Sequence, residues 1–393
     1  MALLSPLKLS PLQLKNRVVL APMTRARAGP SRVANELMAE YYSQRAGAGL
    51  LITEATAVSE GANGWNDSPG IYTDEMERAW ANVTDKVHRA GGVIFVQLWH
   101  TGRTSHSSFH DGRRAVSASA VKIGTPGAHA HTPRGKERCE TPRALRTDEV
   151  REVVNEFRAA TARAKRAGFD GVEVHAASGF LLDCFLQSRT NLRADEYGGS
   201  VAARCRLVEE VVAACSEEWG NPGGVGVRIS PNGSYNDMGS PDFREQFLFL
   251  AERLEKFKET QLCEFQIEQV GGEATEKGKR KGGLAYLAVV DGEKDTDAAF
   301  KPFHGLGNGT PLTMSEFRQV FTGNLMANCG YSQDSAEAAV QSGQCDLVAF
   351  GRLFLSNPDL VERFHSKKSL NPTPSFEFWW DFARGAEGYI HFP

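Results

Sequence analysis

The stretch Gly171-Val172-Glu173-Val174-His175-Ala176-Ala177-Ser178-Gly179-Phe180 joins a short β-branched run to a turn. A helix-period segment precedes it and a run rich in leucine and phenylalanine follows it, so we expect His175 where a strand passes into a helix. In a parallel barrel such strand-to-helix corners form the active face. A histidine at a strand end can also be a satisfied structural residue, and this stretch alone leaves both interpretations open.

The same order of strand and then helix recurs along the chain. Eight short apolar runs are each followed by turn residues and a helix-period segment. The runs are continuous rather than alternating in polarity, which is typical of parallel strands covered on both faces. The expected strands cover residues 17–23, 50–55, 93–99, 171–175, 224–229, 284–290, 324–328 and 346–350. Eight such units predict an α/β fold of the (β/α)8 or TIM barrel type, with a doubly wound sheet as the alternative.

Capping signals mark the ends of several of the helices between these strands. Thr147 is expected to cap one helix and Ser332 another, because both precede segments with helical spacing of apolar residues. Gly168 and Gly343 are expected to end these two helices. Pro358 is expected in the first turn of a helix that follows the last strand.

Some segments do not fit the plain repeat, although we expect one domain over residues 1–393. Residues 101–146, dense in His, Gly, Arg and Pro, are expected to form a lid over the active face. Residues 256–283 are charged and glycine-rich and are interpreted as an insertion before the sixth strand. The glycines of residues 305–309 lie in a predicted loop and form no dinucleotide-binding fingerprint. The aromatic residues 376–382 are interpreted as a packing anchor or, alternatively, as a wall of the site.

Composition and charge narrow the classes of partner. Hydrophobic residues make up 41% of the 393 residues, which is enough to bury a large core. The formal net charge of -3 gives no basic field for nucleic acid, so we expect a small-molecule partner. The seven cysteines form no C-x-x-C pair, which predicts thiols in a reducing compartment. No apolar stretch of about 18 residues occurs, so we expect a cytoplasmic protein without a membrane partner, with an organelle stroma as the alternative.

Polar residues stand where the predicted strands end. Thr24 follows the first strand, Gln97 lies near the end of the third, and Arg228 near the end of the fifth. The turns after strands seven and eight, where this fold commonly binds phosphate, contain Gly330 and Arg352. Each residue alone could be an ordinary turn or surface residue, but together they suit one planar, anionic ligand and predict a phosphorylated flavin. No metal is expected, because no histidine and carboxylate cluster has ligand spacing.

Short motifs in a fixed order carry a resemblance to a known family. They are LAPMTR at 20–25, LITEAT at 51–56, QLWHTGR at 97–103, AGFDGVEVH at 167–175, DEYGGS at 195–200, GVRISP at 226–231, AFGR at 349–352, SNPDL at 356–360 and GAEGY at 385–389. In their order and number these motifs resemble the Old Yellow Enzymes, which are FMN-dependent ene-reductases. The resemblance implies a (β/α)8 barrel, a monomer or homodimer, that holds FMN non-covalently over the carboxyl ends of its strands. It also implies reduction by NADH or NADPH and reoxidation by an α,β-unsaturated carbonyl compound.

The resemblance assigns roles to individual residues. Those that would contact the isoalloxazine ring are Pro22, Met23, Thr24, Ala55, Gln97, His175 and Arg228. Those that would hold the phosphate are Cys329, Gly330, Gly351 and Arg352. Thr24 would hydrogen-bond the carbonyl edge of the flavin and act in catalysis. Arg228 would stabilise the negative charge that develops near the pyrimidine ring on reduction.

The substrate side of the resemblance centres on His175, which would donate a hydrogen bond to the carbonyl oxygen as hydride reaches the β-carbon. The family usually has Asn or His three residues further on and Tyr two residues after that, whereas this chain has Ser178 and Phe180. Both residues and Trp99 are assigned to the substrate site, with Ser178 as a catalytic partner of His175. A phenyl ring cannot donate a proton, so the proton donor stays open.

Two functional interpretations follow from these residues. The leading one is an ene-reductase acting on conjugated carbonyl compounds. The alternative is an FMN-binding flavoprotein whose substrate site has drifted, with weak or non-alkene activity. A flavin-free aldolase or isomerase barrel would require a Schiff-base lysine or a carboxylate base at a strand end, and we identify neither there.

Overall fold

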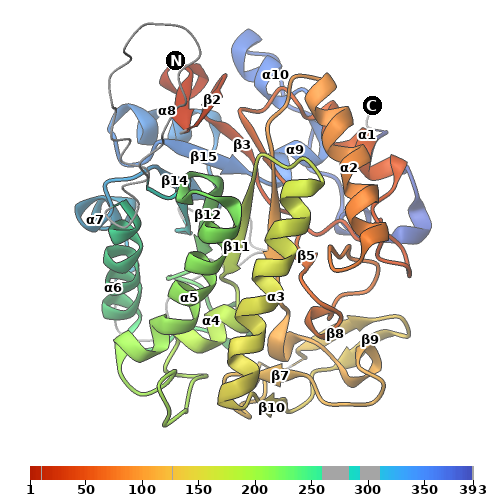
Figure 1. The fold of residues 1–393 in the computed structure, drawn as a ribbon. Helices are drawn as coiled ribbons and strands as arrows, with labels where there is room; N and C mark the ends of the chain where they lie inside the picture. Colours follow the sequence, from red (N-terminus) through yellow and green to blue (C-terminus); the bar gives the residue numbers. More distant parts are fainter. Residues whose placement is uncertain (10, 126, 259–282, 293–309, 392–393) are drawn as a thin grey trace, which may run out of the picture.

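Eight parallel strands pair side by side in a closed ring, with helices around them (Figure 1). The computed structural model describes residues 1–9, 11–125, 127–258, 283–292 and 310–391. The barrel strands are β3 (Val18–Leu20), β4 (Leu50–Ile52), β6 (Ile94–Trp99), β11 (Gly171–Ala176), β12 (Val225–Ile229), β13 (Tyr286–Val290), β14 (Leu325–Asn328) and β15 (Leu347–Phe350). Phe350 of β15 lies opposite Leu20 of β3, which closes the ring. The predicted (β/α)8 barrel is therefore confirmed, and the doubly wound alternative is wrong.

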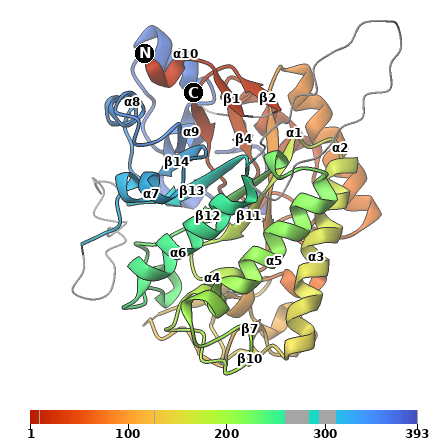
Figure 2. The same cartoon turned by 60° about the vertical axis from the view of Figure 1, so that its left-hand side comes forward.

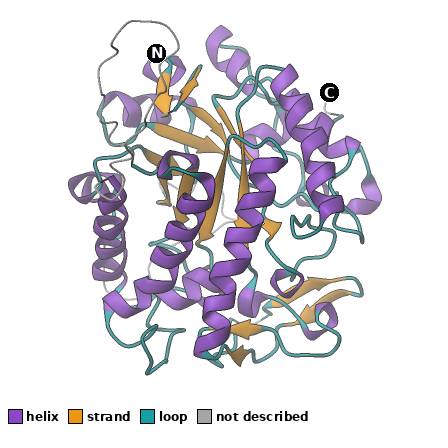
Figure 3. Ribbon diagram, in the orientation of Figure 1, coloured by secondary structure: helices purple, strands orange, loops and turns teal. Residues whose placement is uncertain are grey.

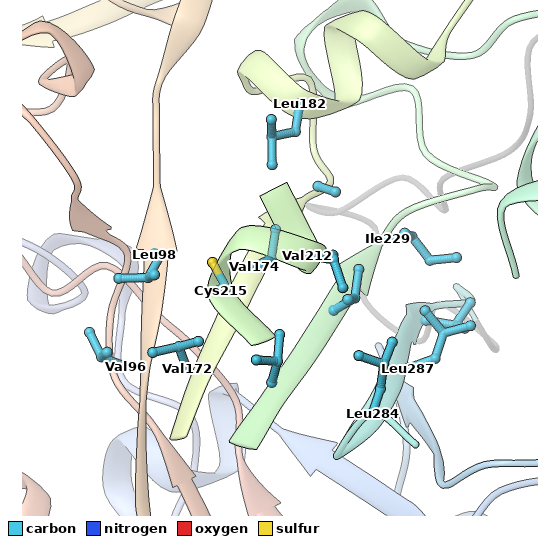
Figure 4. Close-up of a cluster of buried hydrophobic side chains, with 14 of the residues drawn as sticks. Val96, Leu98, Val172, Val174, Leu182, Val212, Cys215, Ile229, Leu284 and Leu287 are labelled. Atoms are coloured by element: carbon cyan, nitrogen blue, oxygen red, sulfur yellow. The ribbon is translucent and has the colours of Figure 1, made fainter. Parts of the chain in front are cut away.

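Each strand is apolar on both faces because the two faces bury different clusters. Alternate residues such as Val172, Val174 and Ile229 point outward and pack against the helices (Figure 4). The intervening residues fill the barrel interior with a second cluster, which includes Val19, Leu50, Ile52, Phe95, Tyr286, Ala288, Met326, Leu347 and Ala349. This double burial explains the continuous apolar runs in the sequence.

The amino-terminal end of the barrel is covered by a hairpin that the sequence pattern did not indicate. β1 (Leu7–Leu9) pairs antiparallel with β2 (Leu12–Leu14). Leu9 and Leu14 are fully buried and belong to the interior cluster. The hairpin thus excludes water from the end of the barrel opposite the candidate site.

The helices lie outside the strands, as Figure 3 shows. They are α1 (Glu36–Gln44), α2 (Asp74–Arg89), α3 (Thr147–Arg166), α4 (Leu181–Leu186), α5 (Val201–Trp219), α6 (Phe243–Glu255), α7 (Met314–Val320), α8 (Gln333–Gln341), α9 (Arg352–Ser356) and α10 (Leu360–Ser366). Figure 2 shows α3, α5 and α6 along one side of the barrel. The long helices α3 and α5 pack together over β11 and β12.

Two of the capping predictions are wrong, that of Thr147 by one position and that of Pro358 by two, and the others are confirmed. Thr147 is the first residue of α3 rather than its cap, because Arg146 takes the cap position and Thr147 Oγ1 donates a hydrogen bond to Asp195 (2.7 Å). Pro358 precedes Asp359, the N-cap of α10, and so lies outside the first turn. Ser332 caps α8, and Gly168 and Gly343 follow their helices at φ values of 81° and 74°, a region that favours glycine.

Residues 101–146 form a layered segment at the opposite end of the barrel from the β1–β2 hairpin (Figure 1). The segment contains the short 3-10 turns Gly102–Thr104 and Ser107–Phe109, the parallel pair β7 (Val116–Ser117) and β10 (Arg143–Ala144), and the hairpin of β8 (His129–Thr132) and β9 (Gly135–Arg138). It packs on α4, which directly follows β11. This position is the one expected of a lid, and the lid function stays a prediction.

The aromatic tail contacts this segment. Trp380 lies edge-on to Trp65 and to His131 of β8, at centroid distances of 5.5 and 5.6 Å. Phe376 and Phe382 are among the exposed large hydrophobic residues. The tail therefore packs through part of its aromatic surface only.

Several predictions concern residues that the structure describes incompletely or not at all. Most of the predicted insertion, residues 259–282, and the glycines of residues 305–309 lie outside the described residues. The six cysteines within the described ranges are free thiols. In the same ranges, no helix is long and apolar enough to span a bilayer, and no group of three metal-ligating side chains occurs.

Candidate active site

The inward-facing positions change from apolar to polar toward the carboxyl ends of the strands. Gln97 lies opposite Glu173 in the pairing of β6 with β11, and His175 lies opposite Arg228 in the pairing of β11 with β12. With Asn328 at the end of β14, these five residues form what we call the polar layer. Each of the five is at most 9% exposed. The structure thus brings together three predicted site residues, Gln97, His175 and Arg228.

Sequence reasoning missed two members of the polar layer, Glu173 and Asn328. Glu173 lies in the middle of a run typical of an ordinary strand, and Asn328 ends its strand as an amide to which no role was assigned. The usable signal was the alternation along β11: because side chains two residues apart share a face, Glu173 must point into the barrel if His175 does.

Hydrogen bonds connect the polar layer in two groups. Gln97 Nε2 donates to Glu173 Oε1 (2.7 Å), and Tyr286 Oη donates to Glu173 Oε2 (3.0 Å). Arg228 Nη2 donates to Asn328 Oδ1, and Asn328 Nδ2 donates to the Ala349 carbonyl (2.6 Å). The hydrogen-bonded side chains of the layer are therefore held by other strands of the barrel rather than by loops.

Burial and the neighbouring charges decide the ionisation of this layer. Burial lowers the pKa of His175 well below its ordinary value, and the Arg228 guanidinium lowers it further. The imidazole is accordingly neutral near pH 7 and carries a single N–H. Burial raises the pKa of Glu173, whereas Arg228, Gln97 and Tyr286 act in the opposite direction by favouring the carboxylate.

Buried polar atoms on β6, β11 and β12 have no hydrogen-bond partner among the described residues. They are His175 Nδ1, Arg228 Nη1 and Trp99 Nε1. Phe180 connects two of these residues, because its ring lies edge-on to His175 and to Trp99 at centroid distances of 5.0 and 4.9 Å. Since buried polar atoms are normally paired, their grouping indicates a polar ligand site.

The turn between β11 and α4, residues 177–180, carries the two substituted substrate positions. Ser178 adopts a φ of 61°, and its backbone N–H donates to Ser230 Oγ (2.7 Å). The Ser178 carbonyl accepts from Asn236 Nδ2 (2.8 Å). The Ser178 side chain is half-buried, and no hydrogen bond joins its hydroxyl to a described residue. The backbone of the turn is thus fixed while the hydroxyl is available to a ligand.

The predicted flavin contacts after β3 and β4 rest on a buried support. Pro22, Met23 and Thr24 are half-buried, and Ala55 is buried. Directly beneath them, Glu54 Oε2 accepts the backbone N–H groups of Arg25 (3.1 Å) and Ala26 (3.0 Å). Burial raises the pKa of Glu54 to about 7.

Arg25 connects this support to the carboxyl-terminal tail. Its guanidinium donates to the carbonyls of Trp379 (2.6 Å), Phe378 (3.2 Å) and Gly388 (2.7 Å). Arg25 is only 1% exposed, so these bonds replace its hydration. Arg25 and Glu54 belong to the motifs at 20–25 and 51–56, but no role was predicted for either residue.

The predicted phosphate residues lie in the turns after the neighbouring strands β14 and β15. Cys329 and Gly330 have positive φ values of 104° and 83°, so this turn is left-handed at two successive residues. Gly351 is the N-cap of α9, and Arg352 is its first residue. A Cβ at Gly351 would lie 3.2 Å from Met23 Sδ, so this turn lies against the predicted flavin contacts. Gly330 is exposed, and Cys329, Gly351 and Arg352 are half-buried.

Comparisons with known proteins cover nearly the whole chain. The model of the NADH:flavin oxidoreductase / NADH oxidase family matches residues 2–371. A putative 12-oxophytodienoate reductase 11 of Oryza sativa subsp. japonica is 39% identical over 376 residues, which cover 94% of this chain and 91% of the relative. The 12-oxophytodienoate reductase 2 of Arabidopsis thaliana is 36% identical over 370 residues, which cover 94% and 90%.

Solved structures are also similar over the whole chain. Morphinone reductase superposes with a TM-score of 0.85 at 37% identity and covers 100% of this chain and 96% of its own. The old yellow enzyme homologue from Zymomonas mobilis superposes with a TM-score of 0.87 at 36% identity, with coverage of 100% and 99%. A structure of morphinone reductase in complex with tetrahydroNAD is similarly close, with a TM-score of 0.84.

Proposed function

The chain belongs to the NADH:flavin oxidoreductase / NADH oxidase family, and from that premise we propose that it reduces the carbon–carbon double bond of α,β-unsaturated carbonyl compounds. It is an FMN-dependent oxidoreductase, and the resemblance to the Old Yellow Enzymes is confirmed. The observation that carries the proposal is the group of unpaired buried polar atoms on His175, Arg228 and Trp99. NADH or NADPH is the proposed reductant.

The residues at the carboxyl end of the barrel fit FMN. The apolar and half-buried surface after β3 and β4 suits a flat ring, and Arg228 Nη1 is a buried donor for its pyrimidine end. The proposed ring contacts are Pro22, Met23, Thr24, Ala55, Gln97, His175 and Arg228. The proposed phosphate contacts are Cys329, Gly330, Gly351 and Arg352. When bound, the flavin supplies a two-electron carrier that takes hydride from the nicotinamide and gives hydride to the alkene.

The chain's own residues would bind and polarise the alkene. The neutral His175 can donate its N–H to the substrate carbonyl oxygen, which gains negative charge as hydride reaches the β-carbon. Ser178 is placed to offer a second, shorter donor, because its hydroxyl makes no hydrogen bond within the part of the chain that the structure describes. Trp99 and Phe180 provide an apolar wall beside His175 that would orient the substrate and exclude water.

Phe180 cannot deliver the proton that the α-carbon requires. A positioned general acid contributes about 10² to 10⁴ in rate, so protonation from solvent is expected to make reoxidation slower than in a barrel with such an acid. This substitution also supports the second candidate function, an FMN-binding flavoprotein with a drifted substrate site. The two candidates share the cofactor and differ in the alkene step.

Anaerobic turnover tests the proposal. The purified protein should contain FMN and should oxidise NADPH or NADH in the presence of cyclohexenone or a maleimide, with formation of the saturated product. Bound FMN without any saturated product would contradict the alkene activity. A colourless protein that does not take up FMN would contradict both candidates.

A paired substitution separates the two candidates. Ser178→Asn combined with Phe180→Tyr supplies a longer donor and a hydroxyl, and asparagine tolerates the left-handed backbone of this turn. A large gain in alkene turnover would favour the drifted site. Unchanged or lower turnover would favour a site adapted to a substrate as it stands.

A further inference from the structure

Glu173 is a buried carboxyl at the centre of the polar layer to which the proposed chemistry assigns no role. It lies in the middle of β11, two residues before His175, and is 0% exposed. A charge in this position is costly unless it is paired, so its presence requires a physical explanation.

The barrel is built to bring two donors to this carboxyl. Tyr286 belongs to β13, two strands away from β11, and reaches Glu173 across Gly226 of the intervening strand β12. A Cβ at Gly226 would lie 2.3 Å from Tyr286 Cζ, so any larger residue would displace the ring. On the other side, Gln97 of β6 donates its amide N–H to the second carboxyl oxygen.

The contacts of Glu173 favour its carboxylate form. Gln97 and Tyr286 both donate to it, and the positive charge of Arg228 on β12 favours its ionised form. Arg228 in turn uses one guanidinium nitrogen for Asn328 and leaves Nη1 unpaired. Burial raises the pKa of Glu173 against these contacts; when Glu173 is ionised, its carboxylate and the Arg228 guanidinium oppose each other's electrostatic field at the proposed flavin site.

We propose that Glu173 is a positioning residue that fixes the Gln97 amide and offsets the charge of Arg228, and that it thereby lowers the reduction potential of the bound FMN. The inference rests on the FMN site proposed above. A reduced flavin carries more negative charge near its pyrimidine ring, so a nearby carboxylate disfavours the reduced form and a guanidinium favours it. With Glu173 ionised, part of the effect of Arg228 is cancelled.

Two variants separate the charge of Glu173 from its hydrogen bonds. Glu173→Gln removes the charge and keeps an oxygen that can accept from Gln97. Tyr286→Phe keeps the charge and the Gln97 contact but removes one hydrogen bond. A third variant, Glu173→Asp, keeps the charge and shortens the reach to Gln97, so it should weaken FMN binding while the potential stays near that of the wild type.

The experiment is a reductive titration of the FMN-loaded proteins against a reference dye, without any alkene. We expect Glu173→Gln to shift the equilibrium at least tenfold toward reduced flavin, which is about 30 mV to more positive potential for a two-electron couple. Tyr286→Phe and Glu173→Asp should shift it much less. Thermal unfolding of each variant verifies that it folds.

Failure of this inference and failure of the proposed function would give different results in these experiments. An unshifted or more negative potential in Glu173→Gln would overturn the inference even if the wild-type protein binds FMN and reduces alkenes. An equal shift in Tyr286→Phe would overturn it as well, because packing rather than charge would then set the potential. A wild-type protein that binds no FMN would overturn both the inference and the proposed function.

Discussion

The polar layer and the β11–α4 turn lie next to each other at one end of the barrel and are built differently. The polar layer consists of strand residues that are at most 9% exposed, and hydrogen bonds hold four of them to other strands of the barrel. In the turn, Ser178 and Phe180 are half-buried. The backbone of Ser178 is hydrogen-bonded to Ser230 and Asn236, whereas its side chain has no hydrogen bond to a described residue. The barrel thus fixes the proposed cofactor side rigidly, while the substrate side depends on residues that can change without disturbing the core.

The largest effect should follow removal of a charge from the polar layer. Arg228→Gln removes the positive charge that favours the Glu173 carboxylate and the guanidinium that donates to Asn328, and leaving such buried polar groups without a partner costs about 1–3 kcal/mol. We expect a matching loss in the free energy of unfolding, measured with urea, together with strongly weakened FMN binding in a fluorescence titration.

A surface arginine provides the control for this prediction. Arg158 pairs with Glu217 at 2.8 Å, but both side chains are more than a third exposed, at 39% and 62%. Arg158→Gln should therefore change stability by less than about 1 kcal/mol. Equal losses in the two variants would contradict the difference drawn between buried and exposed charges.

The next effect concerns His175, where the two regions meet. His175→Ala removes the proposed donor to the substrate carbonyl, which should slow alkene reduction by about 10² to 10³. Because this donor acts on the alkene, reduction of the flavin by NADPH should change much less. Stopped-flow measurement of the two half-reactions separates these effects, and equal losses in both would contradict the role.

The ionisation of His175 gives a further expectation for the wild-type protein. Because burial holds the pKa of His175 well below its ordinary value, the imidazole is already neutral across pH 6 to 8. The pH dependence of the alkene step should therefore contain no ionisation of His175 near pH 6.5. The wild type and His175→Ala should have pH profiles of the same shape in this range. An ionisation near this pH that disappears in the variant would contradict the neutral imidazole.

A smaller effect is expected from the support beneath the proposed flavin contacts. Burial raises the pKa of Glu54 from 4.5 to about 7, so the stability that this group contributes is present below pH 4.5 and is lost as the pH rises through about 7. The difference between these two pKa values corresponds to about 3 kcal/mol in the free energy of unfolding, at 1.36 kcal/mol per pKa unit. Glu54→Gln should remove this loss of stability at high pH.

Urea unfolding of the wild type and Glu54→Gln at pH 5 and pH 8 measures the effect. His100, whose pKa burial lowers to about 3, has the opposite sign, since its contribution is lost as the pH falls below 6.5. His100 is present in both proteins, so its contribution cancels in the comparison. Identical pH dependences of the two proteins would show that Glu54 is not the group that titrates.

The smallest effect should come from the turn itself. The Ser178 hydroxyl makes no hydrogen bond to a described residue, so Ser178→Ala should change stability by no more than about 0.5 kcal/mol. If the hydroxyl assists His175, alkene turnover should fall by up to about tenfold, the value of one ordinary hydrogen bond. A loss as large as that of His175→Ala would contradict the unequal roles of the two residues.

The same contrast explains what the sequence could predict. Continuous apolar runs identified all eight barrel strands because both faces of each strand are buried. The sequence could predict that Gln97, His175 and Arg228 lie together because polar residues near strand ends meet at one face of a barrel. The alternation along Gly171–Ala176 could have placed Glu173 on the inner face with His175, but its hydrogen-bond partner Tyr286 is 113 residues away and no local pattern indicates that contact.

Other features depended on contacts that local patterns do not encode. Thr147 has the side chain of a cap, yet its hydroxyl bonds Asp195, 48 residues away, and Arg146 takes the cap position. The β1–β2 hairpin closes the barrel only because Leu9 and Leu14 meet the interior cluster. The support of Arg25 by the tail carbonyls likewise joins residues more than 350 positions apart.

The most direct test of the proposed reaction is a single anaerobic turnover. The FMN-loaded protein is reduced with one equivalent of NADPH and mixed with cyclohexenone, and the absorbance of oxidised flavin is followed together with the saturated ketone. We predict that oxidised flavin reappears at the rate at which the ketone forms, and that His175→Ala slows both equally. A flavin that stays reduced in the presence of excess alkene, or that reoxidises without forming the ketone, would contradict the proposed function.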